Sequence, residues 1–200
     1  MSKSSGIMLA LLAAGQSRRF GDQDKLAAWL GRNMLGLHAA KSGAGLPFAH
    51  KLVIGSPDHR CAKQWRELGY QIIANEDAAR GQATSVRLAA AQAIDRGAAA
   101  LCIMLADMPF VTRGHLGKLI EAFEQSGRTS TVASSRGGQV MPPAIFPSGG
   151  LKRLMELEGD AGARRLLTDA RLVAGDEHML MDIDTEEDLA RANRIFDKNA

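Results

Sequence analysis

Cysteine is scarce in this 200-residue sequence, which contains only Cys61 and Cys102. Two cysteines cannot build a disulfide framework, and no cysteine or histidine group has the spacing of a zinc site. Cys102 lies within an apolar run and is predicted to be a buried core thiol. The five histidines are scattered along the chain. A reducing cytoplasm is therefore the expected location.

Long hydrophobic runs and a strong charge of either sign are also missing. The apolar stretch Ile7–Ala14 is followed closely by Arg18 and Arg19. It is short for a signal peptide and far below the ~20 residues that span a bilayer. The formal net charge is +3 at pH 7, and the basic residues are spread along the chain. We therefore expect neither a membrane nor a nucleic-acid partner, whereas an anionic small substrate is compatible with the charge.

The apolar segments that are present have the pattern of parallel strands covered by helices. They are continuous rather than alternating, as strands buried on both faces should be. The predicted strands are Ile7–Ala13, Lys51–Ile54, Tyr70–Ala74 and Ala99–Leu105. Helical periodicity is found at Asn33–Ser42, Ser85–Arg96 and Arg113–Gln125, the last capped by Thr112. This alternation predicts an α/β fold, a three-layer α/β/α domain with a mostly parallel, doubly wound sheet.

The last third of the sequence is less regular. The strands predicted there are Thr129–Ser134, Pro143–Phe146 and a short strand end at Asp182–Asp184. The helices predicted there are Gly150–Leu157, one near Ala163–Asp169, and Glu186–Phe196 with Thr185 as its cap. No repeat, low-complexity tract or Pro/Gly-rich linker interrupts the chain. We therefore expect one domain over residues 1–200.

The stretch Leu12–Lys25 has the composition of a phosphate-binding loop. The small residues Ala13–Gly15 follow the first predicted strand and would let backbone N–H groups approach a ligand closely. Arg18, Arg19 and Lys25 come next, and cations beside a nest of N–H groups suit a polyphosphate. The stretch is neither a Walker A loop nor a G-x-G-x-x-G motif. Taken alone, it is equally compatible with a solvated basic turn.

Carboxylates lie at the ends of two predicted strands. Asp107 follows the most apolar strand, and Asp182 and Asp184 lie two residues apart before the final helix. Open α/β sheets bind ligands at the carboxyl ends of their strands, and Mg²⁺ takes one or two carboxylates together with substrate phosphates. Asp107 and one of the later aspartates are therefore candidate magnesium ligands. An aspartate that caps the turn before Pro109 is the alternative for Asp107, and Asp188 is interpreted as a helix-surface charge.

Two glycine-containing turns precede predicted helices. Gly81–Ser85 fits an ordinary helix cap and also a helix start that faces a ligand. Gly159–Arg164 is a turn whose arginine suits bidentate pairing with a phosphate, although a plain connector would have the same composition.

These segments resemble the motifs of the Rossmann-like nucleotidyltransferases. They are most similar to the molybdenum-cofactor cytidylyltransferase and guanylyltransferase group. The matching motifs are L-A-A-G-x-S-x-R-x-G…K from residue 12, G-x-x-x-S from 81, L-A-D-x-P from 105, G-D-x-G-A-R from 159, and D-T-x-x-D-L from 184. Only G-D-x-G-A-R is typical of the molybdenum-cofactor branch. The resemblance covers residues 12–189 and implies the nucleotide-diphospho-sugar-transferase-like form of the fold.

The resemblance also implies roles for individual residues. The implied catalytic residues are Arg19, Lys25 and Asp107. The implied magnesium ligands are Asp107 and Asp184, with Asp182 in reserve. The residues implied to bind the nucleotide or the acceptor are Leu12, Ala13, Ala14, Gly15, Ser17, Arg18, Lys25, Gly81, Ser85 and Arg164. One departure concerns the acceptor, because Met141 and Pro142 stand where the family tends to have glycine and a small or polar residue.

The implied reaction is magnesium-dependent transfer of a nucleotide from an NTP to a phosphorylated acceptor such as molybdopterin, with release of pyrophosphate. A downstream molybdoenzyme or its chaperone would receive the product. The Ala13-Ala14 pair favours CTP, because guanylyl relatives more often carry a second glycine. A guanylyltransferase for the same cofactor, and a cytidylyltransferase for a sugar phosphate or another small phosphorylated metabolite, are the alternatives.

Two other classes of protein fit the sequence less well. An NAD-dependent oxidoreductase should carry G-x-G-x-x-G and an acidic residue after the second strand, and neither is found. A non-catalytic nucleotide-binding module would lack the metal carboxylates, which are present here.

Overall fold

The computed structural model describes residues 6–15, 19–21, 23–159 and 166–198. In this part of the chain, strands form a seven-stranded sheet with the order β5-β4-β1-β6-β8-β7-β9. Its strands are β1 (Ile7–Leu12), β4 (His50–Ile54), β5 (Gln71–Ile73), β6 (Ala100–Leu105), β7 (Val132–Arg136), β8 (Gln139–Pro147) and β9 (Arg171–Ala174). Only β8 runs antiparallel to its neighbours, β6 and β7. The prediction of a mostly parallel α/β sheet is confirmed.

The central strand β1 explains why its sequence is apolar without alternation. It lies between β4 and β6, and all of its side chains are buried. Leu9 and Leu11 belong to the hydrophobic core on one face of the sheet, whereas Met8 and Ala10 belong to the core on the other face. A strand with helices on both faces has no side left for polar residues.

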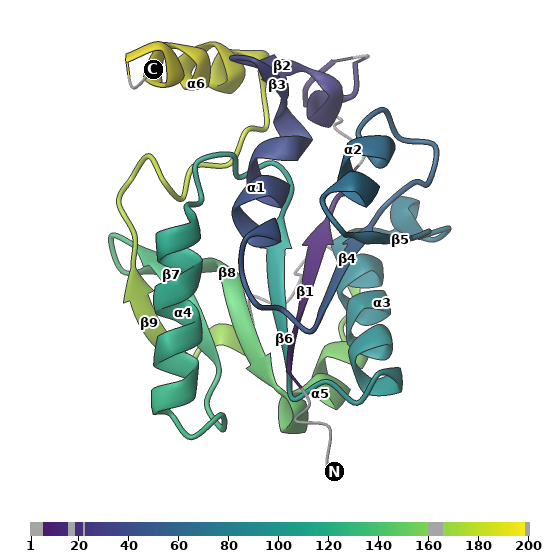
Figure 1. Cartoon of the computed structure of the whole chain (residues 1–200), viewed down its shortest axis with the longest axis vertical. Helices are drawn as coiled ribbons and strands as arrows, with labels where there is room; N and C mark the ends of the chain where they lie inside the picture. Colours follow the sequence, from purple (N-terminus) through teal and green to yellow (C-terminus); the bar gives the residue numbers. More distant parts are fainter. Residues whose placement is uncertain (1–5, 16–18, 22, 160–165, 199–200) are drawn as a thin grey trace.

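Helices cover both faces of the sheet (Figure 1). The helices α1 (Leu35–Ala44), α2 (Ala62–Glu67) and α4 (Arg113–Gln125) pack on the face that carries Leu9. The helices α3 (Gln82–Asp95) and α5 (Leu151–Met155) pack on the opposite face. No helix in the described residues is long and apolar enough to cross a membrane.

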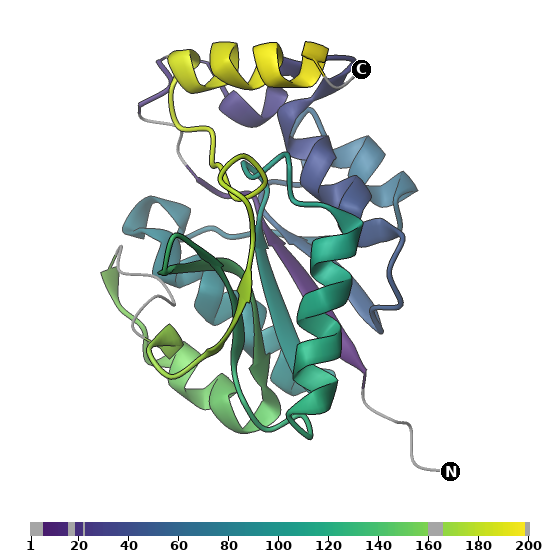
Figure 2. The same ribbon diagram turned by 90° about the vertical axis from the view of Figure 1, so that its left-hand side faces the viewer.

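The last helix, α6 (Glu186–Lys198), lies outside these two layers. Figure 2 shows it across the end of the molecule opposite the N-terminus. It packs against a small hairpin formed by β2 (Trp29–Leu30) and β3 (Asn33–Met34), where Asn193 accepts a hydrogen bond from the backbone N–H of Gly31. The helix α6 therefore lies beside the hairpin that follows β1 in the sequence.

Several predicted elements are confirmed closely. The helix α4 has the predicted bounds, and the Thr112 side chain caps it by accepting a hydrogen bond from His115 N at 3.1 Å. The strands β1, β4, β5 and β6 and the helices α1 and α3 lie within about three residues of their predicted positions. The predicted strands in the last third correspond to β7 and β8, which are longer toward their shared turn.

Other predictions were wrong. The short helix α2 was not predicted, because its six residues contain one large apolar side chain, Trp65, and show no helical period. Of the helix predicted near Ala163–Asp169, residues 166–167 are 3₁₀-helical and 168–169 form a turn, while its first residues lie outside the described part. The strand β9 was missed because it is short and mostly exposed. Residues 182–184 are irregular rather than a strand end.

Candidate active site

A cavity of about 450 Å³ opens at the carboxyl ends of β1 and β6. The order of the strands reverses here. The strands β4 and β5 extend the sheet on one side of β1, whereas β6 lies on its other side. Such a switch point is where open α/β sheets bind ligands. The predicted site residues that line it are Leu12, Ala13, Ala14, Gly15, Arg19, Lys25, Gly81, Ser85, Asp107 and Asp184. The predicted residues Ser17, Arg18 and Arg164 lie outside the described part of the chain.

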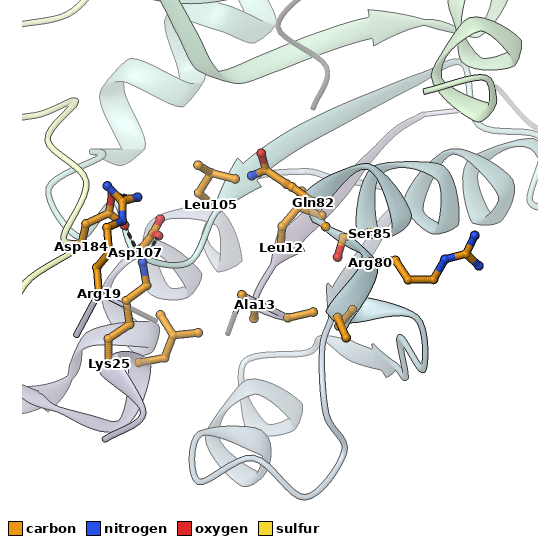
Figure 3. A pocket seen from close by; sticks show the side chains of 16 residues that line it. Leu12, Ala13, Arg19, Lys25, Arg80, Gln82, Ser85, Leu105, Asp107 and Asp184 are labelled. Atoms are coloured by element: carbon orange, nitrogen blue, oxygen red, sulfur yellow. Dashed lines mark hydrogen bonds and ion pairs between the residues drawn. The ribbon is translucent and has the colours of Figure 1, made fainter. Parts of the chain in front are cut away.

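Lys25 joins the two predicted metal ligands. Its Nζ lies 2.6 Å from Oδ2 of Asp107 and 2.9 Å from Oδ1 of Asp184. Arg19 reaches the other oxygen of Asp184 at 2.7 Å. Figure 3 shows these four side chains gathered at one side of the cavity, with Leu12 and Ala13 at its centre and Ser85 beyond them. Lys25 thus meets two carboxylates that lie 82 and 159 positions further along the chain.

The electrostatics of this cluster follow from its burial. Burial alone would lower the pKa of Lys25, but the carboxylates of Asp107 and Asp184 outweigh this effect and raise it above its ordinary value. Burial raises the pKa of the Asp107 carboxyl, while the ammonium of Lys25 opposes that rise. The lysine side chain is only 9% exposed, so its charge is neutralised by protein groups rather than by water. The lysine remains an ammonium at neutral pH.

The two aspartates fit a divalent cation that also contacts substrate. Oδ1 of Asp107 is buried and has no hydrogen-bond partner among the described residues, so this carboxylate oxygen has an unused lone pair. The same residues contain no group of three or more His, Cys, Asp or Glu side chains that could hold a metal. A cation here would therefore take its remaining ligands from phosphate oxygens and water, as Mg²⁺ commonly does.

Asp184 is held by the first turn of α6. The backbone N–H of Ile183 donates to the carbonyl of Asp107 at 3.0 Å, which joins this segment to the end of β6. The carboxylate of Asp188 accepts hydrogen bonds from the backbone N–H groups of Asp184 and Thr185 and from the Thr185 hydroxyl. Thr185 in turn accepts from Asp188 N at 3.1 Å, which completes a capping box. Asp182 is exposed, whereas Asp184 lines the cavity.

Asp188 was therefore interpreted wrongly from the sequence. It is not a plain helix-surface charge, because its carboxylate fixes the backbone of Asp184. Burial raises the pKa of Asp188, but its hydrogen bonds to Thr185 and Asp184 lower it by more. The signal was present in the sequence as Thr-x-x-Asp at the start of a predicted helix.

The opposite wall of the cavity is the start of α3. Gly81 has φ 105° and ψ 170°, a conformation that is essentially restricted to glycine. Asn75, in the loop after β5, donates to the hydroxyls of Thr84 and Ser85 at 3.0 and 2.8 Å. Sequence reasoning missed Asn75, although a polar residue directly after a predicted strand could have been a signal. The first turn of α3 is thus fixed with its N-terminus at the cavity.

The loop after β1 leaves space for a ligand close to its backbone. Ala13 N donates to the carbonyl of Ile54 at 2.8 Å, which ties the start of the loop to β4. A Cβ added at Gly15 would meet no described atom within 4 Å. The N–H groups of Ala14 and Gly15 have no acceptor within the described residues. Such donors at the end of a strand can receive phosphate oxygens.

The cavity also has lining residues that were not predicted, among them Arg80, Gln82 and Leu26. Arg80 belongs to a single helical turn, η2 (Ala78–Arg80), directly before Gly81. In Figure 3 its side chain runs away from the aspartates, so it does not take part in the charge cluster. Cations, carboxylates and backbone donors in one cavity can bind and orient a polyphosphate, whereas both cysteines are buried outside it.

Free backbone donors in a loop and paired carboxylates, both at the switch point of an α/β sheet, are features of nucleotide-binding enzymes. Residues 9–175 match the family described as the MobA-like NTP transferase domain. The chain belongs to this family, since the match spans well over half of it. The chain is also 32% identical over 209 residues to the Purine catabolism protein PucB of Bacillus subtilis (strain 168), covering 97% of this chain and 99% of PucB.

Solved structures show the same fold. Rv0371c from Mycobacterium tuberculosis H37Rv matches with a TM-score of 0.78 and 23% identity over 96% of this chain and 99% of that one. Its complex with manganese matches with a TM-score of 0.74 and 22% identity over 94% and 98%. Molybdopterin-guanine dinucleotide biosynthesis protein A from Archaeoglobus fulgidus matches with a TM-score of 0.66 and 17% identity over 96% and 99%.

Proposed function

We propose that this protein transfers CMP from CTP to a phosphorylated acceptor, molybdopterin or the molybdenum cofactor, with Mg²⁺ and with release of pyrophosphate. One observation carries the proposal: Lys25 joins Asp107 and Asp184 in the cavity that the loop 12–15 also lines. The proposal covers residues 1–200 as one nucleotidyltransferase domain. It places the enzyme in the cytoplasm, a location with which two free, buried cysteines are compatible.

In the proposed reaction, a phosphate oxygen of the acceptor attacks the α-phosphorus of the NTP. A new P–O bond forms to the acceptor, and the bond from the α-phosphorus to the bridging oxygen breaks, which releases pyrophosphate. The acceptor phosphate is already an anion, so no general base is needed. Positioning and charge neutralisation are then the main sources of catalysis.

Each predicted residue has a place in this reaction. The backbone of residues 12–15 would receive phosphate oxygens of the NTP, together with Ser17 and Arg18. Arg19 and Lys25 would neutralise the leaving pyrophosphate. Gly81 and Ser85 would face the base and ribose, and Arg164 would pair with the acceptor phosphate. These roles rest on the cavity that brings most of these residues together.

Asp107 and Asp184 would hold the magnesium ion. A bound Mg²⁺ supplies charge neutralisation at phosphate oxygens and fixes their orientation. The unpaired oxygen of Asp107 supports this assignment. The manganese complex of Rv0371c supports a divalent cation, and the name of the Archaeoglobus protein supports a molybdopterin acceptor.

A pyrophosphate-release screen tests the proposal. Purified protein is incubated with Mg²⁺ and CTP, GTP, ATP or UTP, with and without molybdopterin. We expect release with CTP when molybdopterin is present, and none from an Asp107→Asn variant that keeps its fold by circular dichroism. Release with GTP and with none of the other three nucleotides would make the protein a guanylyltransferase. Release with none of the four nucleotides would contradict the proposal.

A further inference from the structure

The segment that carries Lys25 is too short to hold itself in place. Lys25 begins η1 (Lys25–Ala27), a single 3₁₀ turn. Short turns of this type have poor hydrogen-bond geometry and depend on their surroundings. The ammonium of Lys25 nevertheless lies within hydrogen-bond distance of both Asp107 and Asp184. Some other group must therefore fix the backbone of this turn.

Asp24 supplies the first support. Its Oδ1 accepts a hydrogen bond from Leu26 N at 3.0 Å, and its carbonyl accepts one from Ala27 N at 3.0 Å. The same carboxylate has a second oxygen, Oδ2, which lies 2.6 Å from Nε2 of His59. The two atoms are close, although their geometry is not that of a hydrogen bond. Asp24 thus connects the lysine-bearing turn to the loop after β4.

His59 is itself fixed by two contacts with the core. Its Nδ1 accepts a hydrogen bond from Cys61 N at 3.0 Å, which places the ring proton on Nε2, the nitrogen that lies close to Asp24. Its ring stacks on Trp65, with centroids 4.7 Å apart and planes 22° apart. Trp65 is fully buried and donates Nε1–H to the carbonyl of Gly36 at 2.9 Å. The side chain of His59 is only 9% exposed.

We propose that His59 is a positioning residue that acts through Asp24 to hold Lys25 between Asp107 and Asp184. This inference rests on the proposed function, because it assigns Lys25 a part in the reaction. His59 does not touch the cluster itself, and its effect passes through the 3₁₀ turn. Misplacement of a charged group by about 1 Å is enough to lower turnover by about 10²-fold.

The competing interpretation is that His59 only holds its own loop, through Cys61 N. Two substitutions separate the possibilities, because each keeps one of the two polar contacts. The amide nitrogen of glutamine reaches the position of Nε2, so His59→Gln keeps an N–H group beside Asp24. The amide oxygen of asparagine reaches the position of Nδ1, so His59→Asn keeps the bond from Cys61 N. Both variants lack the ring that stacks on Trp65, which makes them matched controls.

The experiment compares kcat and KM for pyrophosphate release in these two variants and in wild type, with thermal unfolding to confirm folding. We expect His59→Gln to keep kcat within about 3-fold of wild type, and His59→Asn to lose at least about 10-fold in kcat with little change in KM. In an Asp24→Ala background, His59→Asn should cause no further loss, since the two residues act in series. The reverse order, with the asparagine variant active and the glutamine variant impaired, would overturn the inference.

A second measurement does not depend on activity. Lys25 in the wild-type protein is shielded by its two carboxylate partners, so an amine-acylating reagent followed by mass spectrometry should label it slowly. Labelling of Lys25 should be at least about 10-fold faster in His59→Asn and unchanged in His59→Gln. Equal labelling in both variants would reject the positioning role. If the labelling differs but no nucleotide supports pyrophosphate release by the wild type, the proposed function fails while the positioning role stands.

Discussion

Lys25 supplies a positive charge between two carboxylates of the candidate site. Its ammonium contacts two carboxylates whose mutual repulsion would raise the cost of bringing them together. Arg19 adds a second positive charge to Asp184, but its side chain is 75% exposed, so this pair contributes little to stability. The buried pair of Lys25 with Asp107 is the structural centre of the cluster.

We expect Lys25→Ala to lower the rate of pyrophosphate release by at least about 10²-fold, the scale for removing one preorganised charged donor. The substitution also leaves Asp107 buried without its partner, so the melting temperature should fall. Lys41→Ala is a suitable control, because Lys41 is an exposed lysine whose partner is Asn33, outside the cavity. Turnover near that of wild type in the Lys25 variant would remove this residue from the reaction.

Among individual residues, those in local sequence motifs were predicted, whereas those that act through partners far away in the sequence were missed. Gly15, Lys25 and Asp107 were predicted because each lies in a short segment with recognisable composition. His59 was missed because its meaning depends on Asp24, which is far away in the sequence. A lone histidine in a loop carries no such signal.

At the start of α6, the hydrogen bonds that cap the helix also position a residue of the candidate site. Asp184 directly precedes Thr185, so the geometry that starts the helix also sets the direction of the Asp184 backbone. The acidic residues in the first turn, Glu186 and Glu187 among them, suit the positive end of the helix dipole.

We expect Asp188→Ala to destabilise the protein by about 1 kcal/mol, the typical cost of losing a helix cap. It should also lower turnover by about 10-fold, because Asp184 N and Thr185 N lose their acceptor. Chemical denaturation and pyrophosphate release measure the two effects. Asp197→Ala, in the exposed last turn of the same helix, should change neither. An Asp188 variant with unchanged stability would show that the capping box is not needed.

Elements with strong local signals were predicted well, and weak ones were not. The helix α4 combines a capping threonine with a regular apolar stripe, and its bounds were predicted as found. The strand β9 is stabilised by pairing with β7 rather than by its own composition, since Leu172 is half exposed. Its existence depends on a tertiary contact that one sequence does not display.

For the whole molecule, the two buried cores account for the predictability of the fold. Apolar residues on both faces of β1 and β6 require helices on both sides, and this requirement was visible as uninterrupted hydrophobic runs. The antiparallel strand β8 was not foreseen as antiparallel, because apolar composition does not specify strand direction.

Both cysteines lie in the core on the face of the sheet that carries Leu9, and they report on its integrity. Burial raises the pKa of Cys61 to about 12, with the charge of Asp24 adding to the effect, and burial raises the pKa of Cys102 to about 12. We expect neither thiol to react with a disulfide reagent at about pH 8 in the native protein, and both to react after unfolding in urea. The labelling transition should coincide with loss of circular dichroism. Rapid labelling of the native protein would show that this core opens locally.

The contact between Lys25 and Asp184 joins two positions that are 159 residues apart in the sequence. A ribosome that has made β1, β4, β5 and β6 has therefore produced most of the sheet but not the complete charge cluster. Until the residues around Asp184 emerge, the ammonium has only Asp107 as a partner. A chain that stops before Asp184 would therefore lack one of the two carboxylates that hold the Lys25 ammonium in place.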